Sequence, residues 1–183
     1  MNIAICCSSS NNIPETYFES AGKLFENLFR RKNNLVFGAM NSGIMGLAYS
    51  KAKKYERRVI GILPKIYKSD LKDLECDEEI LTKCVNDRTN LMVERADCII
   101  VLPGGMATLY ELFALIEMKR CHDFDKPIII YNETGFFDGV FYFLDEKIFA
   151  EKFTGKAVLH NKFFVAKNSN EVIDYLKSLN EKN

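Results

Sequence analysis

The strongest chemical signal in the sequence is a glycine turn, Pro103–Thr108, which directly follows the apolar run Cys98–Leu102. Its adjacent glycines, Gly104 and Gly105, allow a tight turn and let backbone N–H groups approach a ligand. A helix is predicted to begin near Thr108, so its free N–H groups and the positive end of its dipole face the same point. The spacing indicates an anion site, and a glycine pair that merely turns the chain is the alternative.

Glu111 lies three residues after Thr108 and admits two interpretations. The pattern Thr-x-x-Glu fits a capping box, in which the glutamate accepts a hydrogen bond from the N–H of the cap residue. A carboxylate in the first turn of this helix would also lie beside any bound phosphate ester. The sequence favours neither the cap nor the catalytic carboxylate.

A second glycine-rich loop, Gly38–Gly46, follows the apolar run Leu35–Phe37. It differs from a dinucleotide-binding fingerprint because Met40 occupies the position of the middle glycine. Gly43 and Gly46 could open a helix that packs closely on the sheet, or they could shape a binding site. Packing and binding explain these two glycines equally well.

Two further polar positions follow predicted strands. Arg88 comes after Ile80–Val85, and its guanidinium could form a bidentate contact with phosphate or carboxylate. A solvated arginine in the first turn of a helix is the simpler interpretation. The loop Ser8–Asn12, which includes Ser9, offers hydroxyl and amide groups to a sugar or a base, or is an ordinary polar loop.

Short apolar runs alternate with helical patterns along the whole chain. The runs predict strands at Ile3–Cys7, Leu35–Phe37, Val59–Leu63, Ile80–Val85, Cys98–Leu102, Ile128–Tyr131 and Phe163–Val165. Apolar residues at helical spacing predict helices at about Pro14–Arg31, Ile44–Arg57, Arg88–Ala96, Leu109–Arg120, Phe136–Ala150 and Glu171–Leu179.

This alternation predicts an α/β fold with a Rossmann-like open parallel sheet and helices on both faces. No linker or repeat divides the chain, so we expect residues 1–183 to form a single domain. The segment Tyr67–Glu79 is charged and poorly periodic, which predicts a surface excursion. Ligands of such sheets bind at the carboxyl ends of the strands, where the strand order reverses.

Composition limits the partners. Lys plus Arg equals Asp plus Glu at 25 each, so no basic excess indicates nucleic acid or an anionic membrane. No apolar run approaches the roughly 20 residues that span a bilayer, and the N-terminus shows no signal-peptide pattern. The six cysteines contain no C-x-x-C pair, and Cys6, Cys7 and Cys98 lie in apolar strand-like runs. These three are therefore predicted to be small buried hydrophobic residues in a reducing cytoplasm.

Taken together, the motifs resemble those of the LOG family, cytokinin riboside 5′-monophosphate phosphoribohydrolases often labelled "lysine decarboxylase-like". PGGMATLYE is similar to the family's PGGxGTxxE, VNDRTN to its MxxRK segment and GAMNSGIMG to its GGGxxGLMG. AICCSSS, VIGILP and NETGFFDGVFYFLD are similar to further family segments, so the resemblance covers nearly the whole chain. Ala39 and Met40 stand at glycine positions of the family, which predicts a narrower pocket.

The resemblance implies a hydrolase that cleaves the N-glycosidic bond of a nucleoside 5′-monophosphate, giving free base and ribose 5-phosphate. It implies that the catalytic pair is Arg88 and Glu111. It also implies no metal or other cofactor, and a homodimer. The residues implied to hold the phosphate or shape the pocket are Gly104, Gly105, Met106, Ala107, Thr108, Ser9, Gly43 and Gly46.

Two alternatives belong to other functional classes. One is a non-catalytic binding protein similar to the molybdenum-cofactor carriers that share this fold; the presence of Glu111 favours the enzyme. The other is an amino-acid decarboxylase, whose chemistry needs pyridoxal phosphate on a buried lysine. No glycine loop after a strand contains a lysine, and the nearest is Lys65, so the decarboxylase is disfavoured.

Overall fold

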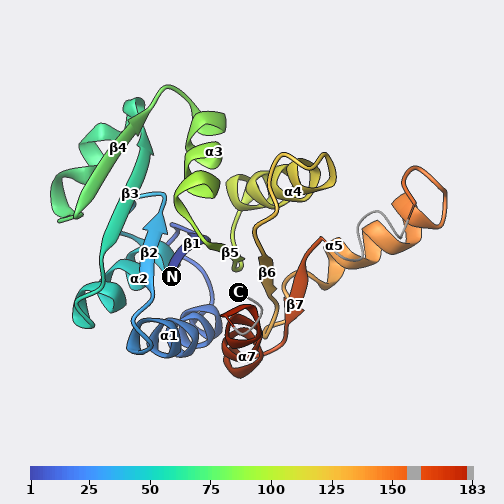
Figure 1. Ribbon diagram of the computed structural model, residues 1–183, viewed down its shortest axis with the longest axis horizontal. Coiled ribbons are helices and arrows are strands. Elements are labelled where there is room, and N and C mark those ends of the chain that lie inside the picture. The colour runs from blue at the N-terminus through green and yellow to red at the C-terminus, as the bar shows by residue number, and fades with distance from the viewer. Residues whose placement is uncertain (156–161, 181–183) are drawn as a thin grey trace.

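The computed structural model describes residues 1–155 and 162–180, and this part of the chain forms one parallel sheet covered by helices (Figure 1). The strand order is β4-β3-β2-β1-β5-β6-β7, so the order reverses between β1 and β5. The predicted α/β fold and its parallel sheet are confirmed. The strands are β1 (Asn2–Cys6), β2 (Asn34–Phe37), β3 (Val59–Pro64), β4 (Glu78–Thr82), β5 (Cys98–Val101), β6 (Ile128–Tyr131) and β7 (Phe164–Ala166).

Helices cover both faces of the sheet. In Figure 1, α1, α2 and α7 lie on one side and α3 and α4 on the other, while α5 and the segment after it extend away from the body. No helix in the described ranges is long and apolar enough to cross a membrane. The helices are α1 (Glu15–Arg30), α2 (Gly43–Lys54), α3 (Val85–Arg95), α4 (Met106–Arg120), α5 (Asp138–Phe143) and α7 (Ser169–Asn180), with a 3₁₀ segment η1 (Lys65–Asp73) and a π-type segment η2 (Leu144–Phe149).

The unbroken apolar strands divide their side chains between two cores. Ile3 and Ile5 of β1 pack with the layer of α1, α2 and α7, while Ala4 and Cys6 pack with the layer of α3 and α4. Successive residues of a strand point to opposite faces, so a strand buried on both faces needs apolar residues at every position. This burial explains why the strand-like runs of the sequence show no polar alternation.

Several element boundaries differ from the sequence-based predictions. Helix α4 begins at Met106 rather than near Leu109, and α3 begins at Val85 rather than at Arg88. Neither helix has a side-chain cap, so the usual sequence signal for a helix start is missing. The single helix predicted for 136–150 divides into α5 and η2, and the predicted surface excursion contains η1 and the start of β4.

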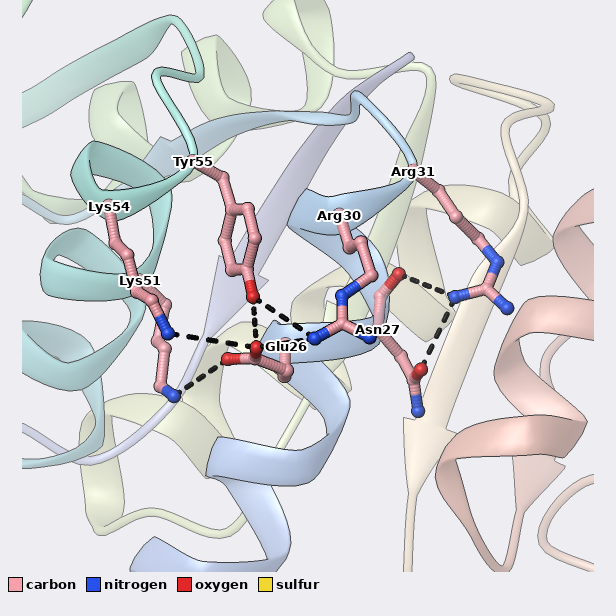
Figure 2. A network of polar contacts seen from close by, with 7 residues as sticks. All are labelled: Glu26, Asn27, Arg30, Arg31, Lys51, Lys54 and Tyr55. Carbon is pink, nitrogen blue, oxygen red and sulfur yellow. Dashed lines mark hydrogen bonds and ion pairs between the residues drawn. The ribbon is translucent and has the colours of Figure 1, made fainter.

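A polar network centred on Glu26 joins α1 to α2 (Figure 2). The Glu26 carboxylate accepts hydrogen bonds from Lys51 Nζ at 2.8 Å, from Arg30 Nη2 at 3.0 Å and from the Tyr55 hydroxyl. These contacts lower the pKa of Glu26 to about 2. The hydrogen bond from Lys51 contributes most to this shift, and the hydrogen bond from Tyr55 comes second. The ionised carboxylate therefore links two helices of the same layer.

Replacing Glu26 with glutamine should lower the melting temperature at pH 7 but not at pH 2. Because the folded-state pKa lies below the ordinary value of 4.5, the stabilisation is present above pH 4.5 and is lost as the pH falls through about 2. Thermal melts of wild type and Glu26→Gln from pH 7 to 2 should converge at the acid end. The exposed Glu19 of α1 provides the matched control, Glu19→Gln. A Glu26→Gln deficit that stays constant over this pH range would contradict the prediction.

Candidate active site

A cavity of about 390 Å³ opens at the carboxyl ends of β1, β2, β3 and β5, around the point where the strand order reverses. This is the edge at which open α/β sheets bind their ligands, and the volume suits a small organic molecule. Its walls come from loops that follow strands, from the end of β3 and from the N-terminal turns of α2, α3 and α4. The lining residues are Cys7, Ser8, Ser9, Ser10, Met40, Met45, Leu63, Tyr67, Arg88, Gly105, Met106, Ala107, Thr108 and Glu111.

Arg88 of α3 and Glu111 of α4 form a buried ion pair in this cavity. Arg88 Nη2 donates to Glu111 Oε1 at 2.5 Å, and the two side chains are only 11% and 6% exposed. The Arg88 Nε atom is also buried and has no hydrogen-bond partner among the described residues. Buried charges are costly unless paired, and an orphaned guanidinium donor is costly even then. The arrangement costs free energy of folding, which is typical of a site selected for function.

The surroundings of Glu111 set its protonation. Burial raises the pKa of the Glu111 carboxyl above its ordinary value, while the nearby Arg88 charge and a hydrogen bond with the Cys6 thiol oppose that rise. Burial, reinforced by the negative charge of Glu111, also raises the pKa of Cys6 well above its ordinary value. Cys6 therefore remains a neutral thiol that can donate to the carboxylate.

The structure overturns the capping interpretation of Glu111. The N-cap of α4 is Gly105, so Thr108 lies inside the first turn and Glu111 lies in the second. A capping box would need Thr108 at the cap position. The carboxylate instead turns inward to Arg88 and Cys6, where it has no part in closing the helix end.

The N-terminus of α4 presents free backbone donors to the cavity. The first N–H groups of a helix have no intrahelical partner, and no side chain caps α4. Met106, Ala107 and Thr108 carry these groups and all three line the cavity. Together with the helix dipole, they make this end of α4 suited to a phosphate or carboxylate.

The N-terminus of α2, in contrast, packs against the loop Ser8–Asn12, called here the serine loop, which accepts hydrogen bonds from its backbone N–H groups. The Gly43 N–H donates to Asn11 Oδ1 at 2.7 Å. Gly43 has φ +60°, and a Cβ there would lie 2.5 Å from the Ser9 carbonyl carbon; a Cβ on Gly46 would lie 2.9 Å from the backbone of Asn41. Close packing of backbone therefore accounts for both glycines.

The structure brings most of the predicted site residues into one cavity. Arg88, Glu111, Ser9 and the turn residues from Gly105 to Thr108 line it, whereas Gly43, Gly46 and Gly104 do not. Gly104 instead packs under Thr108 and lines a smaller neighbouring cavity.

Sequence reasoning missed the electrostatic coupling of Cys6 with Glu111, because Cys6 lies in an apolar strand where its residue type gives no sign of a charged partner. It also did not assign Leu63 or Tyr67 to the site. The available signal was their position: Leu63 ends the predicted strand Val59–Leu63 and Tyr67 lies in the segment that follows it, at the ligand-binding edge.

Neither a metal site nor a Schiff-base lysine is found in the described part of the chain. No group of three or more His, Cys, Asp or Glu residues there is arranged to hold a metal ion. The cavity lining includes no lysine, and Lys65 is exposed outside it. The residues present therefore do not fit pyridoxal phosphate bound as a Schiff base.

Comparison with known proteins shows the family of the chain. Residues 45–176 match the family model described as "Possible lysine decarboxylase". The chain belongs to this family, which is also that of the LOG proteins.

A probable cytokinin riboside 5′-monophosphate phosphoribohydrolase of Arabidopsis thaliana, LOG6, is 33% identical over 80% of this chain and 74% of its own. Its relative LOG5 from the same plant is 29% identical over 96% and 77% of the two chains.

Solved structures show the same fold. The molybdenum cofactor binding protein of Rippkaea orientalis is 25% identical, with a TM-score of 0.71 over 97% of this chain and 96% of its own. A Moco carrier protein from Chlamydomonas reinhardtii is 19% identical, with a TM-score of 0.71 over 100% and 98% of the two chains. The second likeness concerns the fold alone.

The two glycines of the turn should respond differently to alanine. A Cβ on Gly104 would lie 2.1 Å from Thr108 Oγ1 and 3.0 Å from the Ser8 nitrogen, whereas a Cβ on Gly105 meets nothing within 4 Å. Gly104→Ala should therefore lower the melting temperature by several degrees. Gly105→Ala should melt within a few degrees of wild type but bind phosphate esters at least tenfold more weakly, because its methyl group enters the cavity. Thermal melts and calorimetric titration with AMP measure both effects; wild-type AMP affinity in Gly105→Ala would contradict an anion site at this turn.

Proposed function

We propose that this chain hydrolyses the N-glycosidic bond of a nucleoside 5′-monophosphate of the purine or cytokinin type. The products are a free base and ribose 5-phosphate. The observation that carries the proposal is the buried Arg88–Glu111 pair, which shares one cavity with the open N-terminus of α4. The phosphoribohydrolase names of relatives near 30% identity support the same reaction.

The phosphate is held at the α4 N-terminus, where the N–H groups of Met106, Ala107 and Thr108 can donate to its oxygens. Ser8, Ser9 and Ser10 line the adjacent wall, after β1. The Ser8 and Ser10 hydroxyl oxygens accept from the backbone N–H groups of Ser10 and Asn12, so the Ser9 hydroxyl is the best placed to bind the sugar. Glu111 lies one turn deeper along α4, so a sugar attached to this phosphate comes to the carboxylate.

Cleavage breaks the bond between C1′ and the base nitrogen. The bonding electrons leave with the base, and positive charge develops on the sugar as an oxocarbenium-like transition state. The ionised Glu111 carboxylate stabilises that charge and orients a water molecule toward C1′. The water oxygen bonds to C1′, and the proton it loses balances the one that the departing base acquires.

Arg88 keeps Glu111 ionised and positioned. Its guanidinium opposes the effect of burial on the Glu111 pKa, and the 2.5 Å contact fixes one carboxylate oxygen. The Tyr110 hydroxyl donates to Asn86 Oδ1 at 2.5 Å, which ties α4 to α3 beside the pair. A carboxylate has about four acceptor sites, so Glu111 can still accept from water and sugar besides its bonds with Arg88 and the Cys6 thiol.

A non-catalytic carrier is the second candidate. The likeness to the molybdenum cofactor binding protein of Rippkaea orientalis, at 25% identity over almost all of both chains, favours it. A carrier would use the same α4 N-terminus to hold a phosphorylated ligand but would leave that ligand intact. Base release therefore separates the two functions.

Wild-type protein incubated with AMP should release adenine and ribose 5-phosphate in equal amounts, and Glu111→Gln should slow this by about 10² to 10⁴. Glutamine cannot supply the negative charge that the transition state needs. The amide oxygen of the glutamine still accepts a hydrogen bond from Arg88. The free energy of unfolding should therefore fall by less than about 3–5 kcal/mol, which is the usual cost of removing one partner of a buried ion pair. Chromatography of the products measures turnover, and circular dichroism verifies folding.

Glu26→Gln is the matched control, because it removes one negative charge on the α1–α2 side and leaves the cavity unchanged. It should retain wild-type turnover. A Glu111→Gln variant that releases the base at the wild-type rate would contradict the proposed mechanism. Tight binding of AMP without any base release by wild type would favour the carrier.

We also propose that the chain acts as a homodimer in a reducing cytoplasm. All six cysteines are free. Large apolar side chains are exposed on α4 and on the extended segment from α5 onward, namely Tyr110, Phe113, Tyr142, Phe143 and Phe153. Surfaces of this kind mark protein contacts.

Light scattering at micromolar concentration should give twice the 21.0 kDa mass of the chain. The double variant Tyr142→Ser, Phe143→Ser should shift the mass toward the monomer, because it removes the exposed aromatic rings of α5. Lys147→Ser, on η2, is the control. A wild-type monomer under these conditions would refute the dimer.

A further inference from the structure

The cavity has two chemically different halves, arranged in the order of the strands. The turn after β5 and the serine loop after β1 supply hydroxyl and N–H groups. The segment after β2 supplies Met40, the first turn of α2 supplies Met45, and the end of β3 with the segment η1 supplies Leu63 and Tyr67. Because the strand order is β3-β2-β1-β5, the polar half and the apolar half lie side by side along one edge.

A bound nucleotide has one orientation that matches this arrangement of a polar half beside an apolar half. Its phosphate belongs at the α4 N-terminus, near the ends of β5 and β1, and its sugar belongs beside Glu111. The base must then extend over the ends of β2 and β3, which lie one and two strand spacings of about 4.8 Å from β1. Its walls there are Met40, Met45, Leu63 and Tyr67.

This wall is poor in groups that can read the edge of a base. A thioether sulfur is only a weak acceptor, and leucine has no polar atom. Among the described lining residues of this half, Tyr67 alone carries a hydroxyl group, and its side chain is 44% exposed. The neighbouring Arg88 Nη2 donates to Glu111, while the Arg88 Nε atom has no hydrogen-bond partner among the described residues but is buried. Bases differ chiefly in N–H and C=O groups on their edges, and the wall offers little to distinguish them.

The wall is also adaptable. Two of the six methionines of the chain, Met40 and Met45, lie in this wall. Methionine has three rotatable bonds and a polarizable sulfur, so it fits ring systems of different shape and is abundant at promiscuous binding surfaces. Shape and apolar contact therefore dominate recognition at this end of the site.

We infer that the site grips the base by apolar contact with Met40, Met45, Leu63 and Tyr67 and accepts nucleoside 5′-monophosphates with different base edges. This inference rests on the proposed hydrolysis and names its substrate class. A pocket built to hydrogen-bond its ligand rejects the wrong one by 10⁴–10⁵, whereas an apolar pocket discriminates by about 10–200-fold. Because these two ranges do not overlap, the ratio of kcat/KM between nucleotides with different bases decides between the two kinds of pocket.

The test is kcat/KM for base release from AMP, GMP, IMP, CMP and UMP, together with their dissociation constants for Glu111→Gln. The three purine nucleotides should fall within about tenfold of one another, and the smaller pyrimidines within about 200-fold. A gap of 10⁴ or more between AMP and GMP would overturn the inference while leaving hydrolysis intact. If no nucleotide releases its base, hydrolysis fails, and the dissociation constants still decide whether base edges are read.

Met40→Gln locates the base. Met40 is half-buried at the cavity wall, and glutamine of similar length adds an amide that can hydrogen-bond a base edge. The AMP-to-GMP ratio of kcat/KM should change at least fivefold. Ile66→Gln is the matched control, because Ile66 is exposed outside the cavity lining, and it should keep the wild-type ratio. A Met40→Gln enzyme with unchanged kcat/KM for every nucleotide would show that the base does not reach this wall.

Discussion

The site depends on one interaction, the buried ion pair between Arg88 and Glu111. Removing two charges from water costs several kcal/mol per ion, and their mutual attraction repays this cost only when the geometry is good. A well-packed apolar pair at the same positions would hold α3 and α4 together at least as well. Stability alone therefore does not explain the pair, whereas the proposed hydrolysis, which needs a fixed and ionised carboxylate, would explain it.

The fold supplies the geometry that this pair requires. Helices α3 and α4 flank β5 on the same face of the sheet, so one side chain from each can meet beneath the strand ends. The reversal of strand order between β1 and β5 opens the adjoining space. The serine loop is fixed from both sides, since Ser8 N–H donates to Pro103 O at 3.1 Å and Ser8 O accepts from Met45 N–H at 3.0 Å. The free end of α4 thus lies in a rigid frame.

The two glycine-rich loops look similar in the sequence but have different roles in the structure. Gly43 and Gly46 let the N-terminus of α2 pack against the serine loop, whose oxygen atoms accept hydrogen bonds from the N–H groups of Gly43 and Met45. At Gly105 a Cβ would meet no neighbour, so packing does not require glycine there. An open glycine beside unpaired N–H groups is what a ligand needs.

Much of the fold follows from the sequence, because strands buried on both faces must be apolar throughout and their spacing leaves room for crossover helices. Arg88 and Glu111 are identifiable by motif, but their pairing is not, since it depends on how α3 and α4 pack. The start of α4 is misplaced because its cap, Gly105, has no side chain to signal it, while Thr108 imitates a capping box. The contact of Cys6 with Glu111 and the apolar wall around Met40 arise only when separate strand ends meet.

The most direct test of the account is a crystal structure of Glu111→Gln with AMP, in which slowed turnover preserves the ligand. The account predicts phosphate oxygens within hydrogen-bond distance of the N–H groups of Met106–Thr108, and C1′ beside the side chain at position 111. Phosphate bound instead at the Gly43–Gly46 turn, with the sugar remote from position 111, would contradict it.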